Sequence, residues 1–329
     1  MKKFVFCLCV ALLTTISSEA QQISVVSPSG TTTLYRTLQE SIEGADPGSV
    51  IYLPGGGFQI SDEVKITNKK LTIIGIGHYA NNGNADGITT ISGNLFFNEG
   101  SSGSAVIGCY ITGNVYIGEG GASVNDVLIR QCNLNSVQVT NSSCVDTQIN
   151  QSYLRNTSSF NGANALLMNN IIHSINNING DQISNNIILG SWLKGYQYYT
   201  IVANRSNILN NVITINPWRS GVWGHDILVG SDNVVISNMT PTTFGDLSIT
   251  VGGDVDWNDV FVNNGGISPV SDFHFTDAYK QYENQVGIYA GTGFNKQVTS
   301  VPYIIYKDVP TETDAQGMLK VKIRVKANQ

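Results

Sequence analysis

The residues best suited to chemistry gather between positions 192 and 226. Three of the chain's four tryptophans lie there, together with tyrosines, arginines, a histidine and an aspartate. Aromatic rings stack on the apolar faces of sugars, and polar side chains beside them hydrogen-bond the hydroxyls. We therefore predict a carbohydrate-binding site with these contact residues: Trp192, Tyr196, Tyr198, Trp218 and Trp223. The sequence leaves open the alternative that these rings form an outer wall.

The same window holds a candidate catalytic group, Arg219, His225 and Asp226. An arginine fork can hold an anionic group of a substrate, and a histidine beside a carboxylate can move a proton. A lyase acting on an acidic polysaccharide could use these residues, and only such a lyase would call for Ca²⁺. Acidic residues are scattered through the surrounding region, so the sequence predicts no metal site and no resident cofactor.

A repeated six-residue motif surrounds this window and must position it. The motif reads apolar, two variable residues, then Cys, Ser or Asn, one variable residue, and usually apolar. The fourth positions of its seven copies are Cys109, Cys132, Ser152, Asn170, Asn186, Asn211 and Asn238. Successive fourth positions are 23, 20, 18, 16, 25 and 27 residues apart. The motif is therefore constant while the segments between its copies vary in length.

This spacing predicts an all-β fold, a right-handed parallel β-helix. Helical solenoids keep a fixed period, whereas the coils of a β-helix keep short strands and absorb insertions in their loops. Equivalent residues of successive coils stack about 4.8 Å apart, so an inward asparagine can donate to one neighbour and accept from another. We expect motif positions one, four and six to face the core. The two longest intervals between motif copies, 25 and 27 residues, contain the window from 192 to 226. Its loops should therefore project from the side of the solenoid, and we expect the carbohydrate site on a lateral face.

The first twenty residues predict a signal peptide. Lys2 and Lys3 precede an apolar run that is too short to span a membrane, and small residues end it at Ala20. We expect an exported protein, in the periplasm, on the cell surface or outside the cell. We expect residues 21–300 to form the β-helix and residues 301–329 to form a closing hairpin. The net charge of −6 argues against a nucleic-acid partner.

The N-terminal end of the repeat region predicts a short helix. Thr37 is followed by Glu40 at the spacing of a capping box, and the segment ends at Pro47. This helix would cover the first coil and protect its strand edges. Residues 50–53 and 71–75 predict strands, and the glycine-rich residues 54–57 predict a turn.

The C-terminal end predicts a strand with two different faces. Apolar residues alternate with basic ones: Leu319, Lys320, Val321, Lys322, Ile323, Arg324, Val325 and Lys326. This period of two predicts one buried and one basic face, in a hairpin that covers the C-terminal end of the coils. The basic face would discourage edge pairing or, alternatively, contact a polyanion.

Three cysteines remain after the predicted signal peptide. Cys109 and Cys132 share the fourth motif position on adjacent coils, which could bring them near disulfide distance. We expect stacked free thiols that pack as small apolar groups.

The stretch TLQESIEGADPGSVIYLPGGGF, followed by KKLTIIGIG, resembles the N-terminal part of pectate-lyase-like right-handed parallel β-helix proteins. The C-terminal residues resemble the ends of exported β-helix proteins of Bacteroidetes. The resemblance implies the fold over about residues 30–280. It implies less about function, because the family includes lyases, hydrolases, epimerases and non-catalytic surface proteins. We expect binding of a polysaccharide or cell-surface glycan without catalysis; the alternative is a polysaccharide lyase or related carbohydrate-active enzyme.

Overall fold

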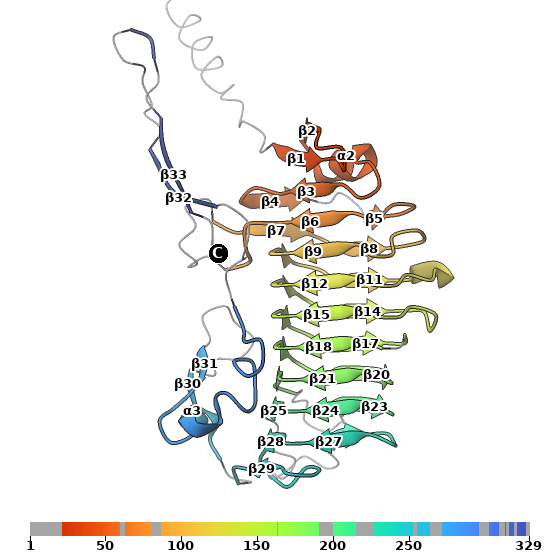
Figure 1. Cartoon of the computed structure of the whole chain (residues 1–329), viewed down its shortest axis with the longest axis vertical. Coiled ribbons are helices and arrows are strands. Elements are labelled where there is room, and N and C mark those ends of the chain that lie inside the picture. The colour runs from red at the N-terminus through yellow and green to blue at the C-terminus, as the bar shows by residue number, and fades with distance from the viewer. Residues whose placement is uncertain are drawn as a thin grey trace, which may run out of the picture.

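The structure is a computed structural model. It describes residues 22–59, 63–79, 87–162, 164–190, 200–214, 227–252, 255–263, 272–295, 303–308, 313, 316–318 and 321–326. Within these residues the chain winds as a parallel β-helix whose rungs stack along one axis (Figure 1). The predicted fold class is confirmed.

Three long sheets run along the solenoid, and each coil adds a strand to each of them. Sheet A contains β3 Val50–Tyr52, β6 Thr72–Ile74, β9 Ala105–Ile107, β12 Leu128–Arg130, β15 Gln148–Asn150, β18 Leu166–Met168, β21 Gln182–Ser184, β24 Asn207–Leu209 and β27 Val234–Ile236. Sheet B contains β4 Gly56–Gln59, β7 Thr89–Ser92, β10 Tyr110–Ile111, β13 Asn133–Leu134, β16 Tyr153–Leu154, β19 Ile171–Ile172, β22 Ile187–Ile188, β25 Val212–Ile213, β28 Met239–Thr240 and β29 Ile249–Thr250. Sheet C contains β5 Val64–Ile66, β8 Leu95–Phe97, β11 Val115–Ile117, β14 Val137–Val139, β17 Ser158–Phe160, β20 Ile175–Asn179, β23 Ile201–Asn204 and β26 Leu228–Val229.

The six-residue motif sets the register of the coils. Ile149 pairs with Leu167, and Leu167 pairs with Ile183, so equivalent motif positions lie on successive rungs. Motif positions one, four and six are buried in every copy except at Val235, which is half-buried in the last copy. Of residues 54–57, which we expected to form a turn, Gly56 and Gly57 belong instead to β4, because their backbone pairs in parallel with β7.

The predicted inner ladder of asparagines is present. The Nδ2 of Asn170 donates to Oδ1 of Asn186 (3.1 Å), whose own Nδ2 donates to Oδ1 of Asn211 (3.0 Å). Asn211 donates in the same way to Asn238 (3.0 Å). At the other end, the Asn170 Oδ1 accepts the backbone N–H of Ser152 (2.9 Å). Because each amide also bonds to a backbone carbonyl, the ladder leaves these buried groups satisfied.

The ladder continues into smaller residues toward the N-terminus. The hydroxyl of Ser152 accepts the backbone N–H of Cys132 (3.2 Å). Cys109, Cys132 and Cys144 are free and buried. Burial raises the pKa of the Cys132 thiol to about 12, which keeps the thiol neutral and apolar in character.

From β9 onward, each coil makes two turns in which one residue adopts a left-handed backbone. The A–B turn joins sheets A and B at the third motif position, and the C–A turn joins sheets C and A. In the A–B turn these residues are Gly108, Gln131, Gln151, Asn169, Asn185, Asn210, Ser237 and Leu247. In the C–A turns that lead into β9 and the later strands of sheet A they are Gly103, Asp126, Asp146, Asn164, Gly180, Arg205 and Asp232. The A–B series includes Leu247, so the motif has an eighth, degenerate copy that ends in β29.

The N-terminal end is closed as predicted. Helix α2 (Leu38–Gly44) begins at Thr37 with a complete capping box to Glu40. Strand β1 (Ile23–Val26) pairs with β2 (Thr32–Tyr35) and with β3, both antiparallel. The Lys69 ammonium binds carbonyls at the end of the helix, at 2.9–3.0 Å. The first rung therefore presents no open parallel edge in sheet A.

After the last coil the chain turns back and covers sheet B from outside (Figure 1). We call the described residues 255–263 and 272–295 the cover. It contains α3 Trp257–Val260, β30 Phe261–Asn263, β31 Asp272–Phe275 and the short 3-10 helix η2 Lys280–Tyr282. Fifth motif positions that point outward are buried beneath it: Tyr153, Ile171, Ile187, Val212 and Met239. The cover thus gives sheet B a second apolar core on its outer side.

The end of the cover is held by outward side chains of the A–B turns. Asn169 Nδ2 donates to the carbonyls of Ile288 (2.8 Å) and Ala290 (2.7 Å). Gln151 Nε2 donates to the Gly293 carbonyl, at 2.9 Å. The segment therefore runs back along the axis, past one coil after another.

The predicted C-terminal hairpin exists: β32 (Tyr303–Asp308) pairs antiparallel with β33 (Lys322–Lys326). The predicted buried face is wrong at Val321 and Ile323, which are 46% and 54% exposed. Among the described strands, the hairpin pairs only within itself, and Figure 1 shows it beside the solenoid rather than below β29. At the last rung it is Phe244 that packs against the core.

Candidate ligand-binding face

The site residues predicted from the sequence lie outside the part of the chain that the structure describes. They are Trp192, Tyr196, Tyr198, Trp218, Arg219, Trp223, His225 and Asp226. Their roles stay predictions. Within the same window, Arg205 is described; its guanidinium donates to Oδ1 of Asn179 (2.8 and 3.1 Å) and links two coils. The fourth tryptophan, Trp257, lies in the cover, stacked on Phe261.

Among the described residues, the outer face of sheet C offers the best site for a ligand. Residues of the sheet alternate between the core and the outside, and the outward residues of successive rungs form a column. The column contains Lys65, Phe96, Tyr116, Gln138, Ser159 and Asn176, each in register with the next. Charge and aromatic rings lie at its N-terminal end, while amides and a hydroxyl continue it.

Two stacked rings form the apolar part of this column. The rings of Phe96 and Tyr116 lie 4.8 Å apart at 11°, and the Lys65 ammonium lies 5.5 Å from the centre of the Phe96 ring. Phe96 is only 1% exposed, so it supports Tyr116 but cannot itself take a ligand. Tyr116 is half-buried, and its hydroxyl oxygen accepts from Asn114 Nδ2 (2.9 Å). The hydroxyl hydrogen therefore remains available to donate to a ligand.

A row of asparagines borders the column where the chain enters sheet C. Asn94 Oδ1 accepts the backbone N–H of Asn114 (2.8 Å), and Asn135 Nδ2 donates to Asn114 Oδ1 (2.7 Å). Asn156 Nδ2 donates to Asn135 Oδ1 at 3.0 Å. These bonds hold the amides in fixed orientations one rung apart. Such an array presents polar groups at a regular spacing along the solenoid axis.

A shallow pocket lies beside the N-terminal end of the column. Its volume is about 490 Å³, and its lining is Thr67, Asn98, Glu99, Glu119, Gly120, Gly121, Ala122 and Ser123. Glu63, 2.8 Å from the Lys65 ammonium, raises the pKa of Lys65, and Glu119 adds to that effect. Glu119 thus belongs to both the pocket and the surroundings of the rings. Across the described residues, no cluster of His, Cys, Asp and Glu could hold a metal ion.

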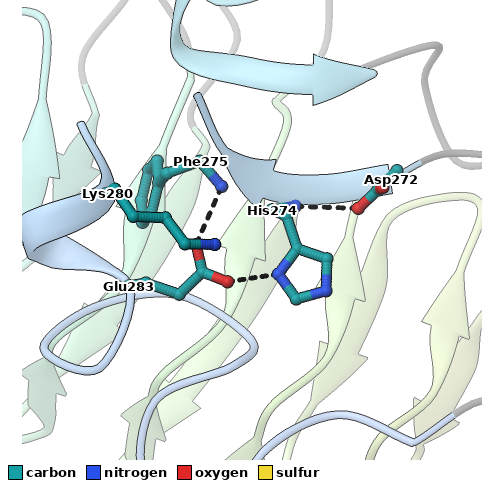
Figure 2. Close-up of polar contacts among 5 residues, drawn as sticks. All are labelled: Asp272, His274, Phe275, Lys280 and Glu283. Carbon is teal, nitrogen blue, oxygen red and sulfur yellow. Dashed lines mark hydrogen bonds and ion pairs between the residues drawn. The ribbon is translucent and has the colours of Figure 1, made fainter. Parts of the chain in front are cut away.

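A second polar cluster lies on the cover (Figure 2). His274 Nδ1 contacts Oε1 of Glu283, while Oε2 of the same carboxylate accepts the Phe275 N–H (3.1 Å) and binds the Lys280 ammonium (3.0 Å). The His274 ring stacks on Tyr289, with centroids 3.8 Å apart. Burial would raise the pKa of Glu283, but the bonds from His274, Lys280 and Phe275 outweigh it and lower that pKa.

A histidine oriented by a carboxylate is an arrangement that can transfer protons. Here, however, Glu283 joins β31 to η2, and Phe273 and Phe275 on either side of His274 are buried against sheet B. Among the described residues, the hydrogen-bond and ion-pair partners of His274 and Glu283 all belong to the cover itself. We therefore assign this cluster to the internal fastening of the cover.

No family model, curated protein or solved structure matches the chain. The resemblance to pectate-lyase-like proteins therefore remains a prediction. In the described residues, no helix is long and apolar enough to cross a membrane.

The sheet C column is difficult to predict from the sequence. The motif lies on sheets A and B, and the distance from it to sheet C changes between coils: Tyr116 follows Val106 by ten residues, and Gln138 follows Ile129 by nine. The outward residues of sheet C could have been found by counting nine or ten residues forward from the first position of each motif copy.

Proposed function

We propose that this protein is an exported β-helix protein that binds carbohydrate on the outer face of sheet C. The observation that carries the proposal is Tyr116, a half-exposed ring supported by Phe96 and bordered by fixed amides. A sugar ring can stack on the tyrosine while its hydroxyls bond to the amides. Export is supported by the N-terminal sequence, with its two lysines and apolar run.

The shape of the face favours a polymer over a small sugar. Outward residues repeat at every rung, so a chain lying along the axis meets a series of similar positions. The column beyond Tyr116 consists of Gln138, Ser159 and Asn176, which are neutral groups that both donate and accept hydrogen bonds. These groups suit hydroxyl-rich sugars. The proposal places binding on the described face, whereas the loops between residues 192 and 226 remain a separate prediction.

Replacing Tyr116 by alanine tests this function. Loss of the stacking ring should weaken binding about fivefold, because an aromatic contact contributes about 1 kcal/mol. Retardation in native gels that contain soluble neutral polysaccharides measures the change. Tyr110→Ala is the matched control, since Tyr110 lies on the same coil, is half-buried, and carries the Arg155 guanidinium 5.1 Å from its ring on sheet B.

Equal loss in both variants, or normal binding by Tyr116→Ala, would contradict the proposal. Absorbance at about 235 nm, which reports the unsaturated uronides a lyase releases from acidic polymers, should not rise with or without Ca²⁺. Sustained turnover would instead establish the alternative function, a polysaccharide lyase, and would direct attention to Arg219, His225 and Asp226.

A further inference from the structure

The pocket beside sheet C continues the outer face of that sheet. Thr67 lies two residues after Lys65, and Asn98 lies two residues after Phe96, so each shares the outward side of the column. Both line the pocket, whose volume of about 490 Å³ is in the usual range for sites that take small organic ligands. Because Tyr116 stacks on Phe96 in the same column, one ligand can contact both the pocket and the Tyr116 ring.

One wall of the pocket is backbone without side chains. The Gly118 N–H donates to the Phe97 carbonyl (3.0 Å), and the short 3-10 helix η1 (Glu119–Gly121) begins at the next residue. Gly120 and Gly121 adopt a left-handed backbone, with φ of 71° and 89°, and a side chain at either position would meet open space. A ring of a ligand can therefore approach this wall closely.

Two carboxylates border the pocket without a basic partner. Glu99 and Glu119 each lie two residues after the end of a strand, β8 and β11, and these strands are neighbours in sheet C. Among the described residues, neither carboxylate forms an ion pair. The Lys65 ammonium is paired with Glu63 (2.8 Å), and Glu119 influences it more weakly. Because like charges repel, the two carboxylates favour a positively charged ligand between them.

Asn98 gives an independent sign that a hydrogen-bond donor is missing. Its Oδ1 is buried and accepts no hydrogen bond, although buried amide oxygens nearly always accept one. The Ser123 hydroxyl donates to the Ser143 carbonyl (3.1 Å), so its oxygen can only accept from a ligand. The pocket therefore presents acceptors, and an ammonium group, which has three donors and accepts nothing, is complementary to them.

We propose that the pocket binds an amino sugar whose amine is free and protonated, as part of the glycan that lies on sheet C. The amine binds between Glu99 and Glu119, while a neighbouring sugar ring stacks on Tyr116. A sugar suits the pocket better than a metal ion, because its volume is that of an organic ligand and only two carboxylates border it. This inference rests on the proposed function, since both assume that a glycan contacts Tyr116.

Oligomers of glucosamine test the inference when they are compared with N-acetylglucosamine oligomers of the same length, because acetylation removes the charge and keeps the sugar backbone. The full chain should bind the glucosamine oligomers more tightly at about pH 6, where sugar amines are protonated. Glu99→Gln with Glu119→Gln should weaken that binding about 2- to 30-fold, as expected for two exposed ion pairs. The same variant should bind the acetylated oligomers as the wild type does. Titration calorimetry measures all four affinities.

The matched control is Glu43→Gln with Asp232→Asn. These substitutions remove two negative charges from exposed positions, one in α2 and one in a C–A turn far along the solenoid. The control variant should bind both kinds of oligomer as the wild type does. General attraction of a cation to an acidic chain would instead weaken glucosamine binding equally in the control and pocket variants.

Three results would overturn the inference. The acetylated oligomers bind as tightly as the charged ones; the control variant loses as much affinity as the pocket variant; or Ca²⁺ alone binds the pocket more tightly than the glucosamine oligomers do. Tyr116→Ala separates this failure from failure of the proposed function. If only the inference fails, Tyr116→Ala weakens binding of neutral polysaccharides while the pocket variant binds glucosamine oligomers normally. If the proposed function fails, Tyr116→Ala binds neutral polysaccharides as the wild type does.

Discussion

The two turns of each coil solve the same geometric problem with different chemistry. Both place one residue in the left-handed region and follow it with a residue that points inward. In the A–B turn the inward residue is asparagine in four successive coils, from Asn170 to Asn238, and neighbours complete one another's hydrogen bonds. In the C–A turn the inward residues differ: Ser104, Val127, Thr147, Ala165, Asp181, Ser206 and Asn233.

The two turns differ in the number of neighbouring coils to which one inward side chain is hydrogen-bonded. An A–B asparagine donates to the side chain of the next coil and to backbone on the other side, so each change disturbs two interfaces. A C–A residue such as Ser206 accepts one backbone N–H, from Asp181 (3.1 Å), and can be replaced by an apolar residue elsewhere in the column. A side-chain ladder therefore demands one residue type, while backbone contacts allow each coil its own residue.

The largest effect is expected for Asn186→Leu, which interrupts the asparagine ladder of the A–B turns. Its Oδ1 accepts both the backbone N–H (2.9 Å) and Nδ2 (3.1 Å) of Asn170, so leucine leaves two buried donors unpaired. We expect a loss of about 3 kcal/mol in the free energy of unfolding, measured by urea denaturation. The adjacent Asn185→Gly keeps the left-handed backbone and should cost well under about 1 kcal/mol. Similar losses in both variants would contradict a special role for the ladder.

The inner ladder was predictable because its residue type is confined to Cys, Ser and Asn at a constant motif position. The left-handed A–B position was not, since Gly, Gln, Asn, Ser and Leu share backbone geometry there but no side-chain chemistry. The cover escaped prediction for another reason. Its partners, such as Tyr153 and Ile288, lie far apart in the sequence, and only the apolar fifth motif positions hinted that sheet B is buried on both sides.

A smaller effect is expected where the C–A turn buries a carboxylate. Asp181 is 1% exposed, and burial raises its pKa from 3.8 to about 6, although the backbone N–H groups of Asn179 and Ala165 oppose that rise. Because the folded state binds the proton more tightly, the stabilisation is complete below pH 3.8 and is lost as the pH rises through about 6.

Asp181→Asn removes this titration. Between about pH 7.5 and 5 the wild type should gain about 1 kcal/mol of unfolding free energy relative to the variant. Urea denaturation of both proteins at the two pH values measures the difference in unfolding free energy between them. Thr147→Val, at the equivalent inward position of an earlier coil, changes no titratable group, so its effect on the unfolding free energy should be the same at both pH values. If the difference in unfolding free energy between the wild type and Asp181→Asn does not change with pH, the burial of this carboxylate does not make the stability depend on pH, and the prediction is wrong.

The smallest effect is expected at the degenerate end of the A–B series, at Leu247. Its φ is 50°, and its side chain is 79% exposed, so leucine bears the cost of a left-handed backbone without gaining burial. Asparagine tolerates this backbone and occupies the same position in earlier coils, at Asn169, Asn185 and Asn210. Leu247→Asn should therefore stabilise the protein by about 0.5 kcal/mol. Leu34→Asn is the matched control: Leu34 is 54% exposed but lies in the extended strand β2, where asparagine is disfavoured, so no gain is expected. Melting curves of the two variants measure the difference. If Leu247→Asn is neutral or destabilising while Leu34→Asn is neutral, the left-handed position has no preference for asparagine. The regularity of the A–B turn would then depend only on its inward asparagines.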